Sequence, residues 1–156
     1  MSGARLLPGV GRANVATGVP LLDHLVTQLA IAGRFDLALE VDPGDAVAEV
    51  EAAGAALGAA VAPLLAAGAH GMGVMPSAEA LAMVVIEASA TALVASNADL
   101  TGAGGLGTDL AARFLDSLAN ACGLTLHVRL FEGEETDHAL EAIFKALGVA
   151  LADAID

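Results

Sequence analysis

The spacing of apolar residues predicts alternating helices and strands. Residues 19–32 carry leucines and alanines at three- and four-residue intervals, the pattern of an amphipathic helix. Residues 34–41 alternate apolar and polar side chains, which is typical of a half-buried strand. The Asp-Pro-Gly-Asp turn at 42–45 separates this strand from a helix over about 47–65. We expect a loop at 68–73, so this part of the chain predicts helix–strand–helix.

The same order returns further along the chain. Residues 81–96 are rich in Val and Ile and predict one long strand, or two strands broken near Ala88 and Ser89. The segments expected after it are a Gly-rich loop at 101–108, a helix at 109–122, a strand at 124–131 and a helix at 138–155. Residues 1–18 lack periodicity, and we expect a loose arm or a short edge strand there.

Matching residues recur at an offset of 90 between the two parts, as in Glu51 and Glu141, Leu57 and Leu147, and Gly58 and Gly148. Such an internal repeat indicates a duplicated unit, with one half at about 17–75 and the other at about 76–156. Repeated helices and strands favour the α+β class, with helices packed on one face of each sheet.

The net charge of −13 argues against nucleic acid and anionic membrane surfaces as partners, because both repel an acidic chain. Residues 52–76 are uncharged, but Pro63 interrupts them and Ala and Gly dominate, so we do not expect a membrane span.

The single cysteine, Cys122, excludes an intrachain disulfide and favours the reducing cytoplasm. An alanine-rich core buries little area per helix, which favours a homo-oligomer.

His138 and Glu141 share one face of the last helix, and His127 is on the polar face of its strand. Imidazole and carboxylate bind borderline metals, although the same residues suit a solvated helix start. His24 follows Asp23, which either orients its ring or is part of an ordinary polar face. Lys145 is the only lysine, and it could hold a phosphate or pair with Glu141 one turn earlier.

Several segments together resemble the imidazoleglycerol-phosphate dehydratase family. They are Thr-Gly-Val-Pro-Leu-Leu-Asp-His-Leu at 17–25, Gly-Arg-Phe-Asp-Leu at 33–37, Glu-Ala-Leu-Ala at 79–82, Asn-Ala-Cys-Gly-Leu-Thr-Leu-His-Val-Arg at 120–129 and Glu-Ala-Ile-Phe-Lys-Ala-Leu at 141–147. The order and spacing of the segments match as well, which makes the resemblance more specific than any one motif.

The resemblance implies a duplicated α+β fold of the ribosomal protein S5 domain 2-like type. It implies a lyase of histidine biosynthesis that dehydrates a small molecule, imidazole glycerol phosphate, with Mn²⁺ as cofactor. It also implies trimers, which in the family assemble into a 24-subunit shell. The positions that match metal ligands of the family are His24, Glu51, His127, His138 and Glu141. Gln28 and Lys145 match substrate contacts.

The sequence departs from the family pattern at its metal motifs. Val47 and Ala48 stand where the first His-His pair is expected, and Asp137 replaces the first histidine of the second pair. No arginine occupies the matching substrate positions at about 71–74 and 90–91. Two hypotheses follow, a divergent dehydratase-like lyase with one metal site or none, and a non-catalytic homologue that serves as a structural or regulatory oligomer.

Overall fold

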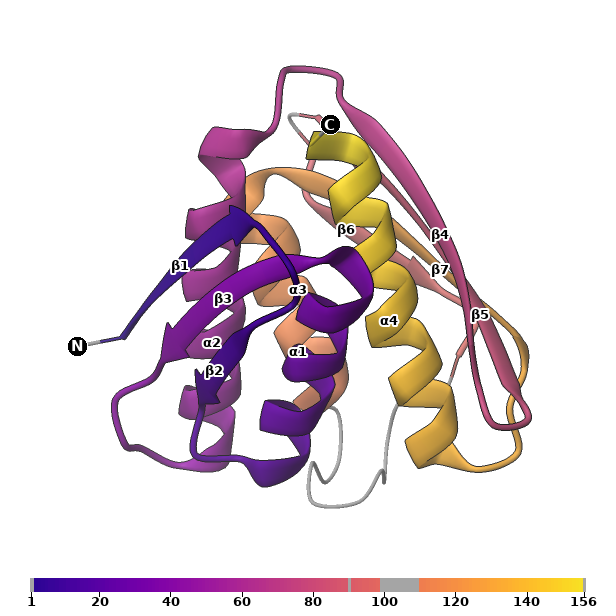
Figure 1. Ribbon diagram of the computed structural model, residues 1–156, viewed down its shortest axis with the longest axis horizontal. Coiled ribbons are helices and arrows are strands. Elements are labelled where there is room, and N and C mark those ends of the chain that lie inside the picture. The colour runs from indigo at the N-terminus through magenta and orange to yellow at the C-terminus, as the bar shows by residue number, and fades with distance from the viewer. Residues whose placement is uncertain (1, 90, 99–109, 156) are drawn as a thin grey trace.

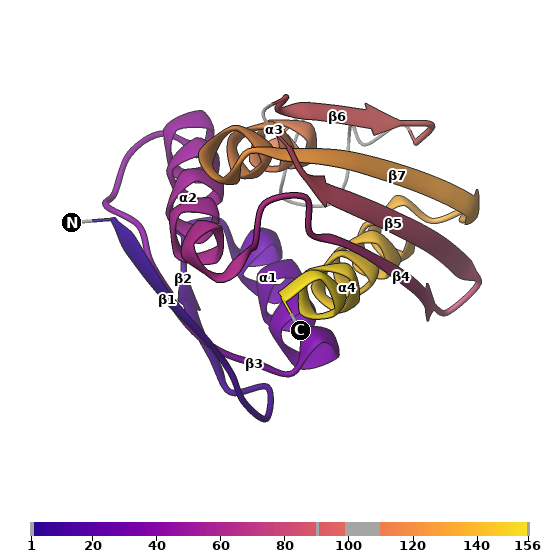
Figure 2. The same ribbon diagram turned by 90° about the horizontal axis from the view of Figure 1, so that it is seen from above.

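The computed structural model describes residues 2–89, 91–98 and 110–155, and it places four helices between two sheets (Figures 1 and 2). The helices are α1 (Pro20–Gly33), α2 (Ala46–Val61), α3 (Leu110–Cys122) and α4 (Thr136–Ile155), and a short 3-10 turn, η1 (Ala62–Leu64), follows α2. The strands are β1 (Gly3–Pro8), β2 (Ala13–Ala16), β3 (Phe35–Glu40), β4 (His70–Ser77), β5 (Ala80–Ala88), β6 (Leu93–Ser96) and β7 (Leu124–Glu132).

The pairing of the strands confirms the duplication. The first sheet has the order β1-β3-β2, with β1 antiparallel and β2 parallel to the central strand. The second sheet has the order β4-β5-β7-β6, with β5 antiparallel and β6 parallel to β7. The unit β1-β2-α1-β3-α2 is therefore repeated as β5-β6-α3-β7-α4, and each sheet presents one face to the helices (Figure 2). β4 is an additional edge strand.

Four details differ from the sequence expectations or decide between them. The loop expected at 68–73 is wrong, because β4 begins at His70 and pairs with β5 as far as Ser77. The first residues form two strands of the first sheet rather than a loose arm. Residues 81–96 form two strands, β5 and β6. The division expected near residue 75 falls inside β4, and the loop expected at 101–108 lies outside the described residues.

Two glycines explain why the pattern of apolar residues does not predict β4. Gly71 and Gly73 are buried, and α4 packs directly on their backbone. A Cβ at Gly71 would overlap the carbonyl oxygen of Ala150, and one at Gly73 would overlap that of Ala146. Gly71 and Gly73, which in the sequence are typical of a loop, are thus required for the close approach of α4 to β4.

The repeated glycines have the same role between helices. A Cβ at Gly58 on α2 would lie 2.5 Å from the Cβ of Ala121 on α3. A Cβ at Gly148 on α4 would overlap the carbonyl oxygen of Leu29 on α1. The neighbouring repeat positions, Leu57 and Leu147, are fully buried. The repeat seen in the sequence therefore marks the two places where helices cross at short range.

Buried side chains from both halves form one hydrophobic core between the sheets. Phe114 on α3 and Phe144 on α4 are fully buried, and their ring centroids are 5.4 Å apart. Burial of each such ring contributes on the order of 2–3 kcal/mol.

Within the described residues one helical stretch, Ala46–Leu64, is long and apolar enough to cross a membrane by length and composition. A core helix passes the same test, and α2 packs along α3.

We predict that Gly148→Ala destabilises the fold by about 1–3 kcal/mol, because a new methyl group must displace backbone at the α1–α4 crossing. In an unobstructed helix the same change is stabilising, by about 1 kcal/mol. Urea unfolding of the two proteins measures the difference. Gly3→Ala is the control, since nothing lies within 4 Å of the added Cβ. Equal or greater stability of the Gly148 variant would contradict the packing described.

Candidate functional site, a polar seam along the last helix

The first half of α4 carries polar side chains on the side that is turned away from the core. His138, Glu141 and Lys145 follow one another at three- and four-residue spacing, which places them on one helix face. Leu140, Ile143, Phe144 and Leu147 are buried on the opposite face. The polar face lies between α1 and the turn that joins β4 to β5 (Figure 1). We call this strip the polar seam, made of His24, Ser77, Glu79, His138, Glu141 and Lys145.

His24 and Glu141 join α1 to α4. The His24 Nε2 atom lies 3.0 Å from Glu141 Oε2, and half of the His24 side chain is exposed. The hydrogen bond from His24 lowers the pKa of Glu141. Ser77 and Lys145 also lower this pKa, whereas partial burial raises it. Asp23 does not orient this ring. Its carboxylate instead accepts hydrogen bonds from the backbone and hydroxyl of Thr17.

His138 has a different carboxylate partner. Its Nδ1 atom lies 2.6 Å from Oε1 of Glu79, in the β4–β5 turn. The other oxygen, Oε2, accepts the backbone N–H groups of Glu134 at 3.0 Å and Glu135 at 3.1 Å. These contacts, the Glu135 N–H first and His138 next, lower the pKa of Glu79 to about 2. The sequence reasoning did not propose Glu79 as a site residue, because 59 residues separate it from His138.

The two expected substrate residues are Lys145, which belongs to the polar seam, and Gln28, which lies next to it on α1. The Lys145 ammonium donates to the carbonyl oxygen of Pro76 at 2.8 Å and acts electrostatically on Glu141. An ammonium group has three hydrogens, so it can still hold an anionic group. Gln28 is half-buried on α1, one turn after His24 and therefore on the same side of the helix. Both expected substrate residues lie beside the His24–Glu141 pair.

Two other expected ligands lie elsewhere. His127 is exposed on the outer face of the second sheet, where it pairs in register with Val85, whereas the helices cover the other face. Glu51 is on α2, and its Oε2 atom lies 3.4 Å from Nη1 of Arg113 on α3. Val47 and Ala48, in the first turn of α2, are exposed.

The donor set of one chain is incomplete for a metal ion. Imidazole and carboxylate are suitable ligands for Mn²⁺, and the polar seam provides two such pairs. Among residues 2–89, 91–98 and 110–155, however, no three His, Cys, Asp or Glu side chains lie together as a metal site requires. Cys122 is not a candidate, because burial raises the pKa of its thiol to about 12.

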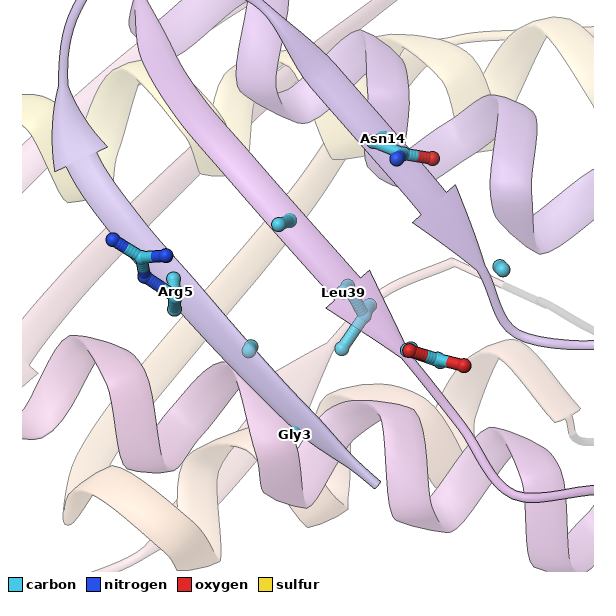
Figure 3. Close-up of a pocket in the computed structure, with 8 residues that line it drawn as sticks. Gly3, Arg5, Asn14 and Leu39 are labelled. Atoms are coloured by element: carbon cyan, nitrogen blue, oxygen red, sulfur yellow. The ribbon is translucent and has the colours of Figure 1, made fainter. Parts of the chain in front are cut away.

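A separate hollow of about 620 Å³ lies on the outer face of the first sheet. Figure 3 shows Arg5 and Asn14 on the strands that flank the strand of Leu39. The remaining lining is Gly3, Ala4, Ala16, Ala38 and Glu40. The hollow is an open surface of small residues with one Arg and one Glu. It therefore has fewer groups that could bind a metal or transfer a proton than the polar seam has.

Comparison with known proteins identifies the family of the chain. A family model described as imidazoleglycerol-phosphate dehydratase matches residues 17–151. The chain belongs to the imidazoleglycerol-phosphate dehydratase family. The enzyme of that name from Pelobacter propionicus is 36% identical over 155 residues, which span 93% of this chain and 79% of that protein. The corresponding protein from Symbiobacterium thermophilum is 37% identical over 161 residues, spanning 96% and 76%.

Solved structures show the same fold. The imidazoleglycerol-phosphate dehydratase of Staphylococcus aureus has a TM-score of 0.85 and 27% identity, and the match covers 97% of this chain and 91% of that one. The Pyrococcus furiosus protein, whose structure is a complex with (S)-C348, also has a TM-score of 0.85, with 26% identity and coverage of 100% and 93%. The expected dehydratase-like α+β fold is therefore confirmed.

The contacts of Glu79 predict a pH-dependent stability. Its pKa is about 2 in the folded protein and 4.5 for an unperturbed glutamate, so the folded state favours the carboxylate. The stabilisation is complete above the ordinary pKa and is lost as the pH falls towards 2. We predict that Glu79→Gln lowers the urea midpoint at neutral pH and that the difference from wild type shrinks below about pH 4.5. A difference that grows on acidification would contradict the prediction.

Proposed function

We propose that the chain is a cytoplasmic carbon–oxygen lyase of histidine biosynthesis that removes water from imidazole glycerol phosphate. The observation that carries the proposal is the His24–Glu141 pair at 3.0 Å, flanked by Gln28 and Lys145. An imidazole–carboxylate pair next to an ammonium group provides a proton-transfer group and an anion contact in one strip. Family membership supports this substrate, whose phosphate is the anionic group.

Dehydration breaks a C–H bond and a neighbouring C–O bond, so one proton is accepted and one is supplied to the departing hydroxide. Glu141 faces Nε2 of His24, so that ring can take up a proton and keep a charge partner. Lys145 can hold the phosphate while its bond to Pro76 fixes the position of the ammonium group. Gln28 can orient the substrate by hydrogen bonds from its amide.

The polar seam offers the imidazole and carboxylate groups that manganese accepts, and His24, His138 and Glu141 would be the contribution of one chain to a site. When bound, the ion would supply positive charge that stabilises charge developing on the substrate. Because the described part of one chain does not gather three ligands, we propose that a second copy of the chain completes any such site, or that no metal site forms.

The outer face of the second sheet supports assembly into a homo-oligomer. Met72, Val74 and Phe131 on this face are exposed by 54%, 45% and 53%. The solvent face of an antiparallel sheet is normally polar, and a contiguous apolar face marks an interaction site. His127 on β7 pairs in register with Val85 on β5 and is exposed on the same face. Assembly through this face would therefore place its imidazole next to a second copy of the chain. We propose a trimer, or a 24-subunit shell of trimers.

We predict that the purified protein dehydrates imidazole glycerol phosphate and that His24→Ala or Glu141→Gln lowers kcat/KM by about 100-fold or more. The expected cause is loss of the proton-transfer pair with the fold intact. His70→Ala is the control, because this exposed imidazole lies at the start of β4, outside the polar seam. Bound Mn²⁺ per chain is measured in parallel by elemental analysis. Wild-type turnover in the His24 variant would contradict the assignment.

A second prediction concerns assembly. Val74→Glu places a charge on the exposed apolar face and is expected to reduce the particle mass measured by light scattering. Leu7→Glu is the matched control, since Leu7 is also apolar and exposed by 57% but belongs to the first sheet. Equal loss of mass in both variants, or in neither, would argue against assembly through the second sheet.

The alternative is a non-catalytic homologue that keeps the assembly. The Glu51 carboxylate pairs with Arg113, and Val47 and Ala48 offer no ligand atoms, so the first turns of α2 do not supply a metal site of their own. An assembled wild-type protein with neither turnover nor bound Mn²⁺ would favour this alternative.

A further inference from the structure

Glu79 is fixed by three donors from the segment that opens α4. Its Oε2 atom accepts the N–H groups of Glu134 and Glu135, and its Oε1 atom faces Nδ1 of His138 at 2.6 Å. Both oxygens are therefore engaged, and the carboxylate cannot turn without breaking a hydrogen bond. Glu79 comes from the β4–β5 turn, so its contacts tie that turn to the helix start.

This contact decides which nitrogen of His138 is available. An ionised carboxylate only accepts hydrogen bonds, so the Nδ1 atom that faces it must carry the hydrogen. In a neutral imidazole the other nitrogen, Nε2, then has the free lone pair. We propose that Glu79 is a positioning residue that holds His138 in the Nδ1–H form and presents Nε2 as a lone-pair donor of the polar seam. The inference rests on the proposed function only in treating His138 as a site residue.

His24 provides an internal comparison. Its Nε2 atom faces the carboxylate of Glu141 at 3.0 Å, so its free nitrogen is Nδ1. The two histidines of the polar seam thus present opposite ring nitrogens, each because of a different carboxylate. Both rings are about half exposed, at 50% for His24 and 43% for His138, so packing in the core does not set their orientation.

Nitrogen-15 NMR of the metal-free full-length protein tests the assignment at about pH 8, where imidazole is ordinarily neutral. In wild type, Nδ1 of His138 is expected to give the signal of a protonated ring nitrogen and Nε2 that of an unprotonated one, with the reverse for His24. In Glu79→Ala the Nδ1–H form of His138 is expected to become the minor form, because free imidazole prefers hydrogen on Nε2.

Two further variants separate positioning from a loss of structure. Glu79→Gln keeps the shape of the side chain, but its amide oxygen is needed by the N–H groups of Glu134 and Glu135, so its NH2 group faces Nδ1 and is expected to favour the Nε2–H form of His138. Glu135→Gln removes a charge from the segment that opens α4 and keeps the backbone N–H, so it should leave the tautomer unchanged. An Nε2–H form of His138 in wild type, or an unchanged tautomer in Glu79→Ala, would overturn the inference.

Titration with Mn²⁺ alone keeps this inference distinct from the proposed function. Loss of a residue that orients a ligand typically weakens metal binding by about 10–100-fold, and we expect that loss for Glu79→Ala and not for Glu135→Gln. Wild-type Mn²⁺ affinity in Glu79→Ala would overturn the positioning role. No Mn²⁺ binding and no dehydration by wild type would instead count against the proposed function and leave the NMR result to decide the tautomer.

Discussion

The structure depends on the close approach of α4 to its two neighbours. Gly148 allows α4 to cross α1 with backbone against backbone, and Gly71 and Gly73 allow the same helix to lie on β4. At interior packing densities a single added methyl group has to displace neighbouring atoms. This constraint sets the distance between α1, α4 and the β4–β5 turn. The polar seam is the solvent-facing edge of that contact, so its geometry follows from the glycines beneath it.

The two halves of the chain show how one scaffold can keep its packing while its chemistry diverges. Gly58 and Leu57 in the first half match Gly148 and Leu147 in the second, and both sets are buried at helix crossings. The polar positions differ, because Glu51 pairs with Arg113 whereas Glu141 pairs with His24. Packing positions tolerate little change, since a new side chain would overlap backbone. An exposed ion pair contributes little stability, so these positions can differ between the halves with little effect on the stability of the fold.

Much of the fold could be predicted from periodicity, because amphipathic helices and alternating strands bury one face each. β4 could not, since Gly71 and Gly73 have no side chains to show an alternating pattern. Helix spacing predicts that Lys145 lies near Glu141, but His24 could be joined to these two residues only through the family resemblance. The pairing of Glu79 with His138 depends on where a hairpin turn meets a helix, and no spacing along the chain encodes that.

The two carboxylates of the polar seam have different physical situations, which bears on what the histidines can do. Glu79 makes two backbone hydrogen bonds besides its contact with His138, so its charge is stabilised even if that ring moves away. Glu141 depends mainly on His24, with Ser77 and Lys145 as weaker contributors. Loss of the histidine contact therefore matters more to the charge of Glu141 than to that of Glu79. Under the proposed function, the His24–Glu141 pair would exchange a proton with the substrate, whereas the Glu79–His138 pair would hold a fixed lone pair.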